Sequence, residues 1–113
     1  MREKLPLRRA ATTIDVVHQT MHGSHQVVTA CLGFYEDGRI GEVFLYGSKV
    51  GTEVDVATKD GAILLSFALQ HGVKLSDIRS AMTRDATGAP EGIMGTVIEA
   101  IVASGYQEPG PLA

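Results

Sequence analysis

Apolar and polar residues alternate along the first half of the chain, with the period of two that is typical of half-buried β-strands. The alternation marks three segments, at residues 12–20, 26–35 and 40–46. Short polar segments separate them, and the Asp37-Gly38 pair in the second is a dipeptide that tight hairpin turns favour. We therefore predict three consecutive strands that form an antiparallel meander.

One side of each predicted strand is more apolar than the other, and these sides should line a common face of the sheet. That face is predicted to carry Ile14, Val16, His18, Val28, Ala30, Leu32, Phe34, Val43 and Leu45. Cys31 lies in the same apolar stretch, where a cysteine is more often a small buried hydrophobe than a reactive thiol. We therefore assign Cys31 to the core.

In the second half of the chain, the apolar residues recur every three or four positions, which is the helical period. Residues 52–71 contain no proline, and the run AILLSFAL within them is apolar almost all round, so we predict a central, buried helix. Ser66 should return its hydroxyl to the carbonyl four residues earlier, and Gly72 should end the helix in a left-handed cap. The predicted apolar stripe consists of Val54, Ala57, Gly61, Leu64, Leu65 and Ala68.

Two shorter helices are predicted to follow. Ser76 can cap one that ends at Met82, residues 83–89 form a polar loop, and Pro90 suits the first turn of the last helix. That helix ends before Gly105, and its apolar stripe consists of Ile93, Met94, Val97, Ile98, Ile101 and Val102. Three strands followed by three helices predict an α+β fold with the helices packed on one face of the sheet.

Length and composition fit one small domain. The chain has 113 residues, 44% of them hydrophobic, and a single cysteine, so one core is expected without a disulfide framework. No apolar run reaches the roughly 18 residues of a membrane span, and we expect a cytoplasmic protein. The predicted organisation is a basic arm at residues 1–11, a folded domain at residues 12–105 and a C-terminal tail at residues 106–113.

The chain has a net charge of −3, but its N-terminus is basic. The arm carries Arg2, Lys4, Arg8 and Arg9 against one acid, whereas the rest of the chain is acidic. Two interpretations stay open: the arm folds back onto its own acidic body, or it contacts a phosphate backbone or an acidic partner. The second interpretation makes a small nucleic-acid-binding module the alternative function.

Two phrases of the sequence carry a resemblance to a known family. GFYEDGRIGEVFLYGSKVGTEVD resembles the strand-turn-strand segment of the TSCPD domain, and LLSFALQHGVKLSDIRSAM is similar to the helical segment of that domain. Together they cover roughly residues 25–82. The domain is found near the C-terminus of adenosylcobalamin-dependent ribonucleoside-diphosphate reductases and as small stand-alone bacterial proteins. The phrases LPLRRAATTIDVVH and TRDATGAPEGIMG look like the stand-alone members.

The resemblance implies an association with ribonucleotide reduction. The reductases use several thiols and a corrinoid site on a large barrel domain, whereas this chain has one cysteine. We therefore expect a non-catalytic accessory or regulatory domain that acts through protein contacts or by binding a nucleotide-like anion, with a ribonucleotide reductase as a candidate partner. No cofactor is expected, and cobalamin is linked to the chain only through the family. Whether the chain has an enzymatic activity of its own stays open.

The best ligand-binding candidate in the sequence is the segment at residues 47–52, between the last strand and the long helix. It lacks the spacing of a P-loop, but backbone N–H groups at a helix start, beside a lysine and a threonine, can hold an anion. Two charged residues of the family-like hairpin complete the site, although they could instead form only a turn and a cross-strand charge pair. The predicted site for an anion or nucleotide consists of Arg39, Glu42, Lys49, Gly51 and Thr52.

Three histidines, His18, His22 and His25, surround the first turn with the spacing H-x3-H-x2-H. Histidines that converge on one point can hold a metal ion, but this spacing matches no strict zinc signature. Exposed loop histidines are therefore the alternative to a metal site, and a metal-dependent enzyme is the third functional hypothesis.

The sheet face opposite the helices is predicted to be partly apolar, with Val27, Cys31 and Phe44. Exposed apolar patches of this kind usually meet a partner. We therefore expect a homodimer.

Overall fold

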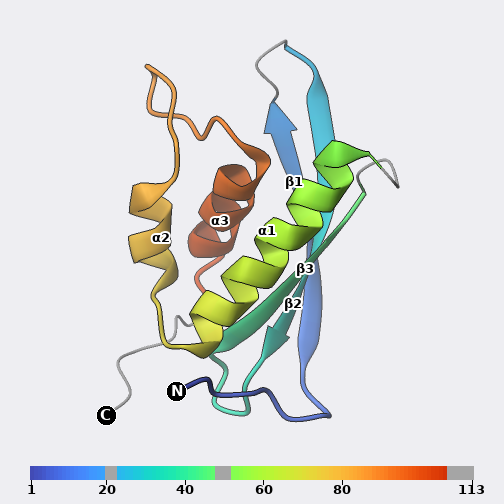
Figure 1. The fold of residues 1–113 in the computed structure, drawn as a ribbon, viewed down its shortest axis with the longest axis vertical. Coiled ribbons are helices and arrows are strands. Elements are labelled where there is room, and N and C mark those ends of the chain that lie inside the picture. The colour runs from blue at the N-terminus through green and yellow to red at the C-terminus, as the bar shows by residue number, and fades with distance from the viewer. Residues whose placement is uncertain (20–22, 48–51, 107–113) are drawn as a thin grey trace.

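A computed structural model describes residues 1–19, 23–47 and 52–106 of the chain. Three antiparallel strands precede three helices, which confirms the predicted α+β order (Figure 1). The elements are the strands β1 (Ala11–Gln19), β2 (His25–Phe34) and β3 (Ile40–Tyr46) and the helices α1 (Glu53–Gln70), α2 (Leu75–Ala81) and α3 (Ile93–Ala103). No helix within these described ranges is both long and apolar enough to cross a membrane.

The sheet is a meander in the order β1-β2-β3. Val16 of β1 lies opposite Val28 of β2, and Leu32 of β2 lies opposite Val43 of β3. At the hairpin between β2 and β3, Gly38 has a φ of 91°, a positive value that glycine adopts without strain. The predicted strand pairing and its tight turn are thereby confirmed.

The helices lie on one side of the sheet, where α1 and α3 pack against the strands, α2 packs against α3, and the core lies between the layers (Figure 1). Full burial of one aliphatic side chain contributes about 1.5–3 kcal/mol, so this layer is the main source of stability. The strand residues in it are mostly those that the alternation assigned to this face, because successive side chains of a strand point to opposite sides. The core side chains, each at most 5% exposed, are Val16, Val28, Ala30, Leu32, Ile40, Val43, Leu45, Ala62, Leu65, Leu69, Leu75, Val97, Ile98 and Ile101.

The helix α1 is less buried than its sequence predicts. Ile63, Leu64 and Phe67 are exposed, with Leu64 the most exposed of the three at 71%. The helix lies across the sheet with α2 and α3 on one flank, so its outer side meets no other element (Figure 1). The prediction of a central, buried helix is therefore wrong. The residues that α1 buries are Asp55, Thr58, Ala62, Leu65, Leu69 and Gln70.

Both ends of α1 have caps. Oγ1 of Thr52 accepts the N–H of Asp55 at 3.1 Å, which satisfies one of the free donors in the first turn. Gly72 follows the helix with a φ of 84°, as expected of a left-handed cap. The start and the end of this helix are thus set by local chemistry that the sequence displays.

The starts of the other two helices differ from expectation. Lys74, not Ser76, is the N-cap of α2, and α3 begins after the N-cap Gly92 rather than at Pro90. Pro90 instead forms an isolated bridge with Arg84, which holds the two ends of the polar loop together. Both predictions rested on residue preference alone, and at Pro90 the pairing within the loop overrode it.

The helix α1 also closes the free edge of β3. Oγ of Ser66 accepts the N–H of Val43 at 2.9 Å and lies 3.1 Å from the carbonyl oxygen of the same residue. Nε2 of Gln70 donates to the carbonyl of Gly41 at 3.0 Å. The expected bond from Ser66 to the carbonyl of Ala62 is also present, at 2.9 Å. These side chains satisfy edge groups that would otherwise be available to a further strand.

Candidate functional site

The basic N-terminal arm folds back beneath the sheet and the end of α1 (Figure 1). Nε and Nη2 of Arg9 both bind the carboxylate of Glu42. Arg2 binds Oε1 of Gln70, and its guanidinium lies 4.3 Å from the ring centroid of Phe67. These contacts favour the interpretation in which the arm packs on its own body.

Glu3 and Arg39 fasten the arm to the hairpin. Nη2 of Arg39 lies 3.0 Å from both carboxylate oxygens of Glu3, and its Nε lies 2.7 Å from Oδ2 of Asp37. The hydrogen bond with Glu3, followed by that with Asp37, raises the pKa of the Arg39 guanidinium. The backbone N–H of Arg39, followed by its side chain, lowers the pKa of Asp37. The hydroxyl of Tyr35 donates to the carbonyl of Glu3, and burial raises the pKa of that hydroxyl.

Two described members of the predicted anion site, Arg39 and Thr52, lie apart in the structure. Arg39 precedes β3 and Thr52 follows it, so the two lie beyond opposite ends of that strand. Glu42 binds Arg9 rather than Arg39, so the expected charge pair within the hairpin is not formed either. The two remaining members of the predicted site, Lys49 and Gly51, lie outside the described residues.

The other two basic side chains of the arm, Lys4 and Arg8, form no ion pair within the described part of the chain. Nucleic-acid interfaces usually present a clustered basic patch. With Arg2 and Arg9 engaged inside the protein, the arm offers less free positive charge to a phosphate backbone than its composition suggests.

The two described histidines of the predicted cluster, His18 and His25, do not lie together. His18 lies near the end of β1 on the face towards the helices, and its Nδ1 is 2.8 Å from Oγ1 of Thr96 in α3. His25 is exposed at the start of β2, opposite Gln19, and His22 lies outside the described residues. Among the residues that the structure describes, no three histidine, cysteine or acidic side chains are placed to hold a metal ion.

A pocket of about 420 Å³ opens beside His18. It lies between the end of β1, the polar loop that follows α2 and the start of α3. No lysine or arginine lines the pocket within the described ranges. Its polar side chains come from His18, Gln19, Asp85, Thr87, Glu91 and Thr96, and we call it the His18 pocket.

Hydrogen bonds fix the polar loop beside this pocket. Oδ1 of Asp85 accepts the hydroxyl of Thr87 at 2.6 Å and the N–H groups of Thr87 and Ala89 at 2.8 and 3.0 Å. The bond from the Thr87 hydroxyl, followed by that from the Ala89 N–H, lowers the pKa of Asp85. Gly88 closes the turn with a φ of 87°. The carboxylate of Asp85 therefore holds the loop in one conformation.

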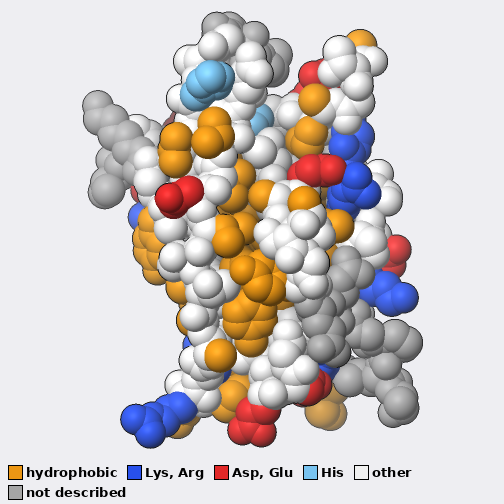
Figure 2. Space-filling model, turned by 180° about the vertical axis from the view of Figure 1, so that it is seen from behind, with side chains coloured by type: hydrophobic (Ala, Val, Ile, Leu, Met, Phe, Trp, Pro, Cys, Tyr) orange, Lys and Arg blue, Asp and Glu red, His pale blue; other side chains and the backbone are white. Residues whose placement is uncertain are grey.

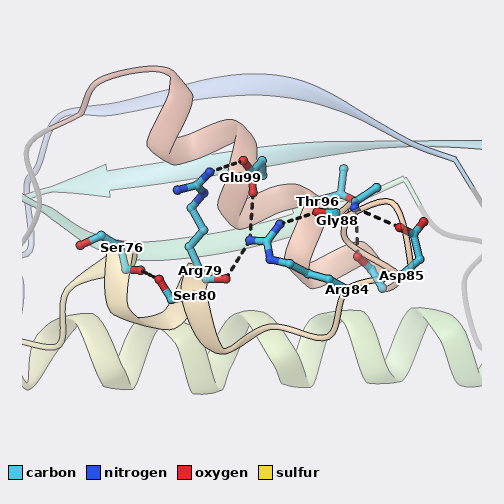
Figure 3. A network of polar contacts seen from close by, with 10 residues as sticks. Ser76, Arg79, Ser80, Arg84, Asp85, Gly88, Thr96 and Glu99 are labelled. Carbon is cyan, nitrogen blue, oxygen red and sulfur yellow. Dashed lines mark hydrogen bonds and ion pairs between the residues drawn. The ribbon is translucent and has the colours of Figure 1, made fainter.

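Arg84 ties the same loop to both short helices (Figure 3). Its Nη1 donates to the carbonyl of Gly88 at 3.0 Å, and its Nη2 donates to the carbonyl of Arg79 at 2.9 Å. Glu99 of α3 binds Arg79 at 2.8 Å and Arg84 at 3.3 Å. The hydrogen bond from Arg79, together with the weaker one from Arg84, lowers the pKa of Glu99.

The face of the sheet opposite the helices is uncovered, and hydrophobic side chains gather in the middle of it (Figure 2). Val17 and Val27 lie side by side across β1 and β2, and Phe44 and Tyr46 follow on β3, all between 44% and 58% exposed. Cys31 lies opposite Phe44 and is half-buried. Its assignment to the core is therefore wrong, because it alternates with the core residues of β2. We call these five residues the open-face patch.

Little in the sequence indicates the His18 pocket. His18 was visible as a polar residue at a core position of its strand, but Thr96, Asp85 and Glu91 read as ordinary helix and loop residues. The pocket depends on the approach of β1 to a loop far along the chain, and no periodic pattern encodes that contact.

Comparison with known proteins gives the family. The model of the TSCPD domain matches residues 3–104. The chain is 37% and 38% identical over 82 residues, 73% of its length, to the vitamin B12-dependent ribonucleotide reductases of Bradyrhizobium diazoefficiens and Agrobacterium fabrum. It is 35% identical over 77 residues, 68% of its length, to the protein of the same name from Rhodopirellula baltica. No solved structure matched the chain.

The chain spans only 6% of the length of the first two relatives and 7% of the third. The family match, in contrast, includes all three strands and all three helices. The resemblance that the hairpin and helix phrases carry is thus confirmed over nearly the whole described fold. The chain therefore belongs to the TSCPD domain family, which is related to a small part of the vitamin B12-dependent ribonucleotide reductases.

Proposed function

We propose that this TSCPD domain is a non-catalytic accessory module of ribonucleotide reduction, and that it acts by binding a vitamin B12-dependent ribonucleotide reductase through the open-face patch. The observation that carries the proposal is the uncovered apolar patch on one sheet face, in a domain whose relatives carry the matching segment inside a reductase chain.

The size of the patch supports a specific contact. With side-chain areas of about 150–250 Å² for the aromatic residues and somewhat less for valine, the exposed fractions leave roughly 400 Å² of apolar surface. That value lies within the range of about 300–600 Å² for the largest patch on a monomer, which is often functional. Removing this surface from water at about 25 cal/mol per Å² gives a driving force large enough to offset part of the cost of association.

The surroundings of the patch also suit an interface. Its five side chains are uncharged, but Asp15 and Thr29 lie between the Val17–Val27 pair and the Cys31–Phe44 pair. Asp15 accepts the hydroxyl of Thr29 at 2.8 Å, and Glu42 is neutralised by Arg9. Because these polar groups are paired within the protein, burying them in an interface costs less than burying unpaired ones.

The chain's own chemistry supports a non-catalytic role. A single cysteine cannot form an intramolecular dithiol pair, which the reduction of a ribonucleotide by thiols would require. The His18 pocket, at about 420 Å³, has the size that suits a drug-like ligand, and a corrinoid is several times larger. The pocket therefore does not fit vitamin B12, and we assign that cofactor to the reductase.

The proposal is tested by measuring the binding of the full chain to the purified, intact reductase of Bradyrhizobium diazoefficiens by biolayer interferometry. We expect saturable binding, and we expect Val27→Lys to weaken it at least about tenfold, because a charge then replaces an apolar contact of the patch. Val56→Lys is the matched control, because Val56 is 53% exposed on α1 whereas Val27 is 52% exposed on the sheet.

Three outcomes would overturn the proposal. The first is that no binding is detected when one protein is in 100-fold molar excess over the other. The second is that Val27→Lys and Val56→Lys weaken binding equally. The third is that sedimentation shows the predicted homodimer, in which a second copy of the chain covers the patch, and that this dimer does not bind the reductase. Circular dichroism and thermal unfolding of both variants establish that each still folds.

A further inference from the structure

The outer edge of β1 carries a row of unpaired backbone groups. In the sheet that the described residues form, β1 pairs only with β2. The N–H of Phe34 donates to the carbonyl of Ala10, and in an antiparallel ladder the hydrogen-bonded pairs alternate along the strands. Every second residue of β1 therefore bonds to β2, and the backbones of the residues between them, Thr13, Asp15 and Val17, point outwards.

The two outer edges of the sheet differ in how they are protected. At β3, the side chains of Ser66 and Gln70 bind outward backbone groups of the strand. At β1, no described side chain binds the outward groups of Thr13, Asp15 or Val17, and all three residues are exposed. An edge with free N–H and C=O groups is a template for a further strand. The edge of β3 is thus closed by α1, whereas the edge of β1 is open.

The composition of β1 makes its open edge suitable for pairing. Proteins usually blunt an exposed edge with proline, lysine, a bulge or a very short strand. β1 is nine residues long, contains no proline, glycine, lysine or arginine, and keeps an unbroken register with β2. Its segment TTIDVV, at residues 12–17, consists of β-branched residues apart from Asp15, and such residues favour extended backbone. The usual obstacles to an added strand are therefore missing from this edge.

Asp15 lies at the middle of this edge and is the only acidic or basic residue among residues 11–17. Its carboxylate accepts the hydroxyl of Thr29 at 2.8 Å but forms no ion pair with a described residue. A second copy of the chain, paired antiparallel over residues 13–17, places Asp15 opposite its own copy, and like charges directly opposite are destabilising. A lysine or arginine at that position forms a favourable pair instead. The charge therefore favours a partner with a basic residue over a second copy of this chain.

We propose that residues 13–17 of β1 bind an extended segment of a partner protein as a fourth, antiparallel strand with a lysine or arginine opposite Asp15. The outward N–H and C=O groups exchange hydrogen bonds with the segment, and these bonds supply the affinity. Segment residues opposite Ile14 and Val16 are apolar, because those two side chains lie in or against the core. This inference does not rest on the proposed function, because the open-face patch binds through side chains and the edge binds through its backbone.

The test is an NMR titration of the isotopically labelled full chain with the peptide acetyl-TVKVT-amide, whose lysine is placed opposite Asp15. We expect saturable shifts and slowed amide exchange at Thr13, Asp15 and Val17. An N-methyl group on the lysine nitrogen removes an N–H that faces β1, so affinity should fall about tenfold. The matched control carries the N-methyl group on the following valine, whose N–H faces away, and it should bind nearly as well as the parent peptide.

Two variants of the chain complete the test. Asp15→Lys should reverse the charge preference, so that acetyl-TVEVT-amide binds several-fold more tightly than the lysine peptide. Thr13→Pro removes an outward N–H without touching the ladder with β2 and should weaken binding several-fold, whereas Thr13→Ala keeps that N–H and should not. If Thr13→Pro fails to fold, Asp15→Lys decides. Shifts that do not saturate, equal affinity for the two N-methylated peptides, an unchanged charge preference, or a homodimer paired through β1 would each overturn the proposal.

Discussion

Ser66→Ala tests whether α1 stabilises the edge of β3 through a hydroxyl. In the native protein Oγ of Ser66 accepts the N–H of Val43 at 2.9 Å and can donate to the carbonyl of Val43 or of Ala62. Val43 is 1% exposed, so water cannot replace the lost acceptor without opening the contact between helix and strand. The substitution removes one oxygen atom and leaves a buried N–H without a partner.

The expected magnitude follows from that orphaned donor. Leaving a buried polar group unsatisfied costs about 1–3 kcal/mol. The carbonyls of Val43 and Ala62 contribute less to the loss, because only one of them can receive the hydroxyl proton at a time and each can accept a hydrogen bond from another donor. For a domain of this size, a loss of 1 kcal/mol lowers Tm by about 4 °C or somewhat more. We therefore expect Tm to fall by about 4–12 °C.

Urea and thermal unfolding followed by circular dichroism measure the loss, and amide exchange of Val43 reports the site directly. Ser80→Ala is the control, because the hydroxyl of Ser80 also bonds to a carbonyl four residues earlier, that of Ser76, but lies exposed on α2. A change of less than about 0.5 kcal/mol is typical of such a surface position. If Ser66→Ala cost no more than Ser80→Ala, or if exchange at Val43 stayed slow, the edge-capping role would be refuted.

Two further predictions concern packing and pH. A Cβ atom on Gly33 would lie 2.3 Å from Oε2 and 2.7 Å from Cγ of Glu42, so Gly33→Ala should lower the free energy of unfolding by about 1–3 kcal/mol. Urea denaturation in a Glu42→Ser background should show a much smaller loss, and an unchanged loss would contradict the steric explanation. Arg79 and Arg84 lower the pKa of Glu99, so the carboxylate contributes stability that is present at neutral pH and is lost as pH falls below about 5. Tm measured from pH 7 to pH 3 should therefore fall less steeply for Glu99→Gln than for the native chain, and parallel curves would disprove the contribution.

The sequence predicted local features of the site well and its assembly poorly. The Asp37-Gly38 turn and the cap at Gly72 depend on a few neighbouring residues, and both are found as expected. Arg39 and Thr52 of the predicted anion site are close in sequence, but a strand separates them in the structure. The His18 pocket was missed for the opposite reason, since Thr96 is 78 residues away from the histidine that it contacts.

The order of the elements and the core face of the sheet follow from the amino-acid sequence, because its apolar side chains recur with periods of two and of about 3.6 residues. It could not determine which side of α1 would be buried, because AILLSFAL offers apolar residues in every direction and only the placement of α2 and α3 leaves Leu64 exposed. Tertiary structure also decided the partners of the charged residues. Arg9 and Glu42, 33 residues apart, meet because the arm folds back beside the hairpin, and long-range charge pairing follows from that geometry rather than from any repeat in the sequence.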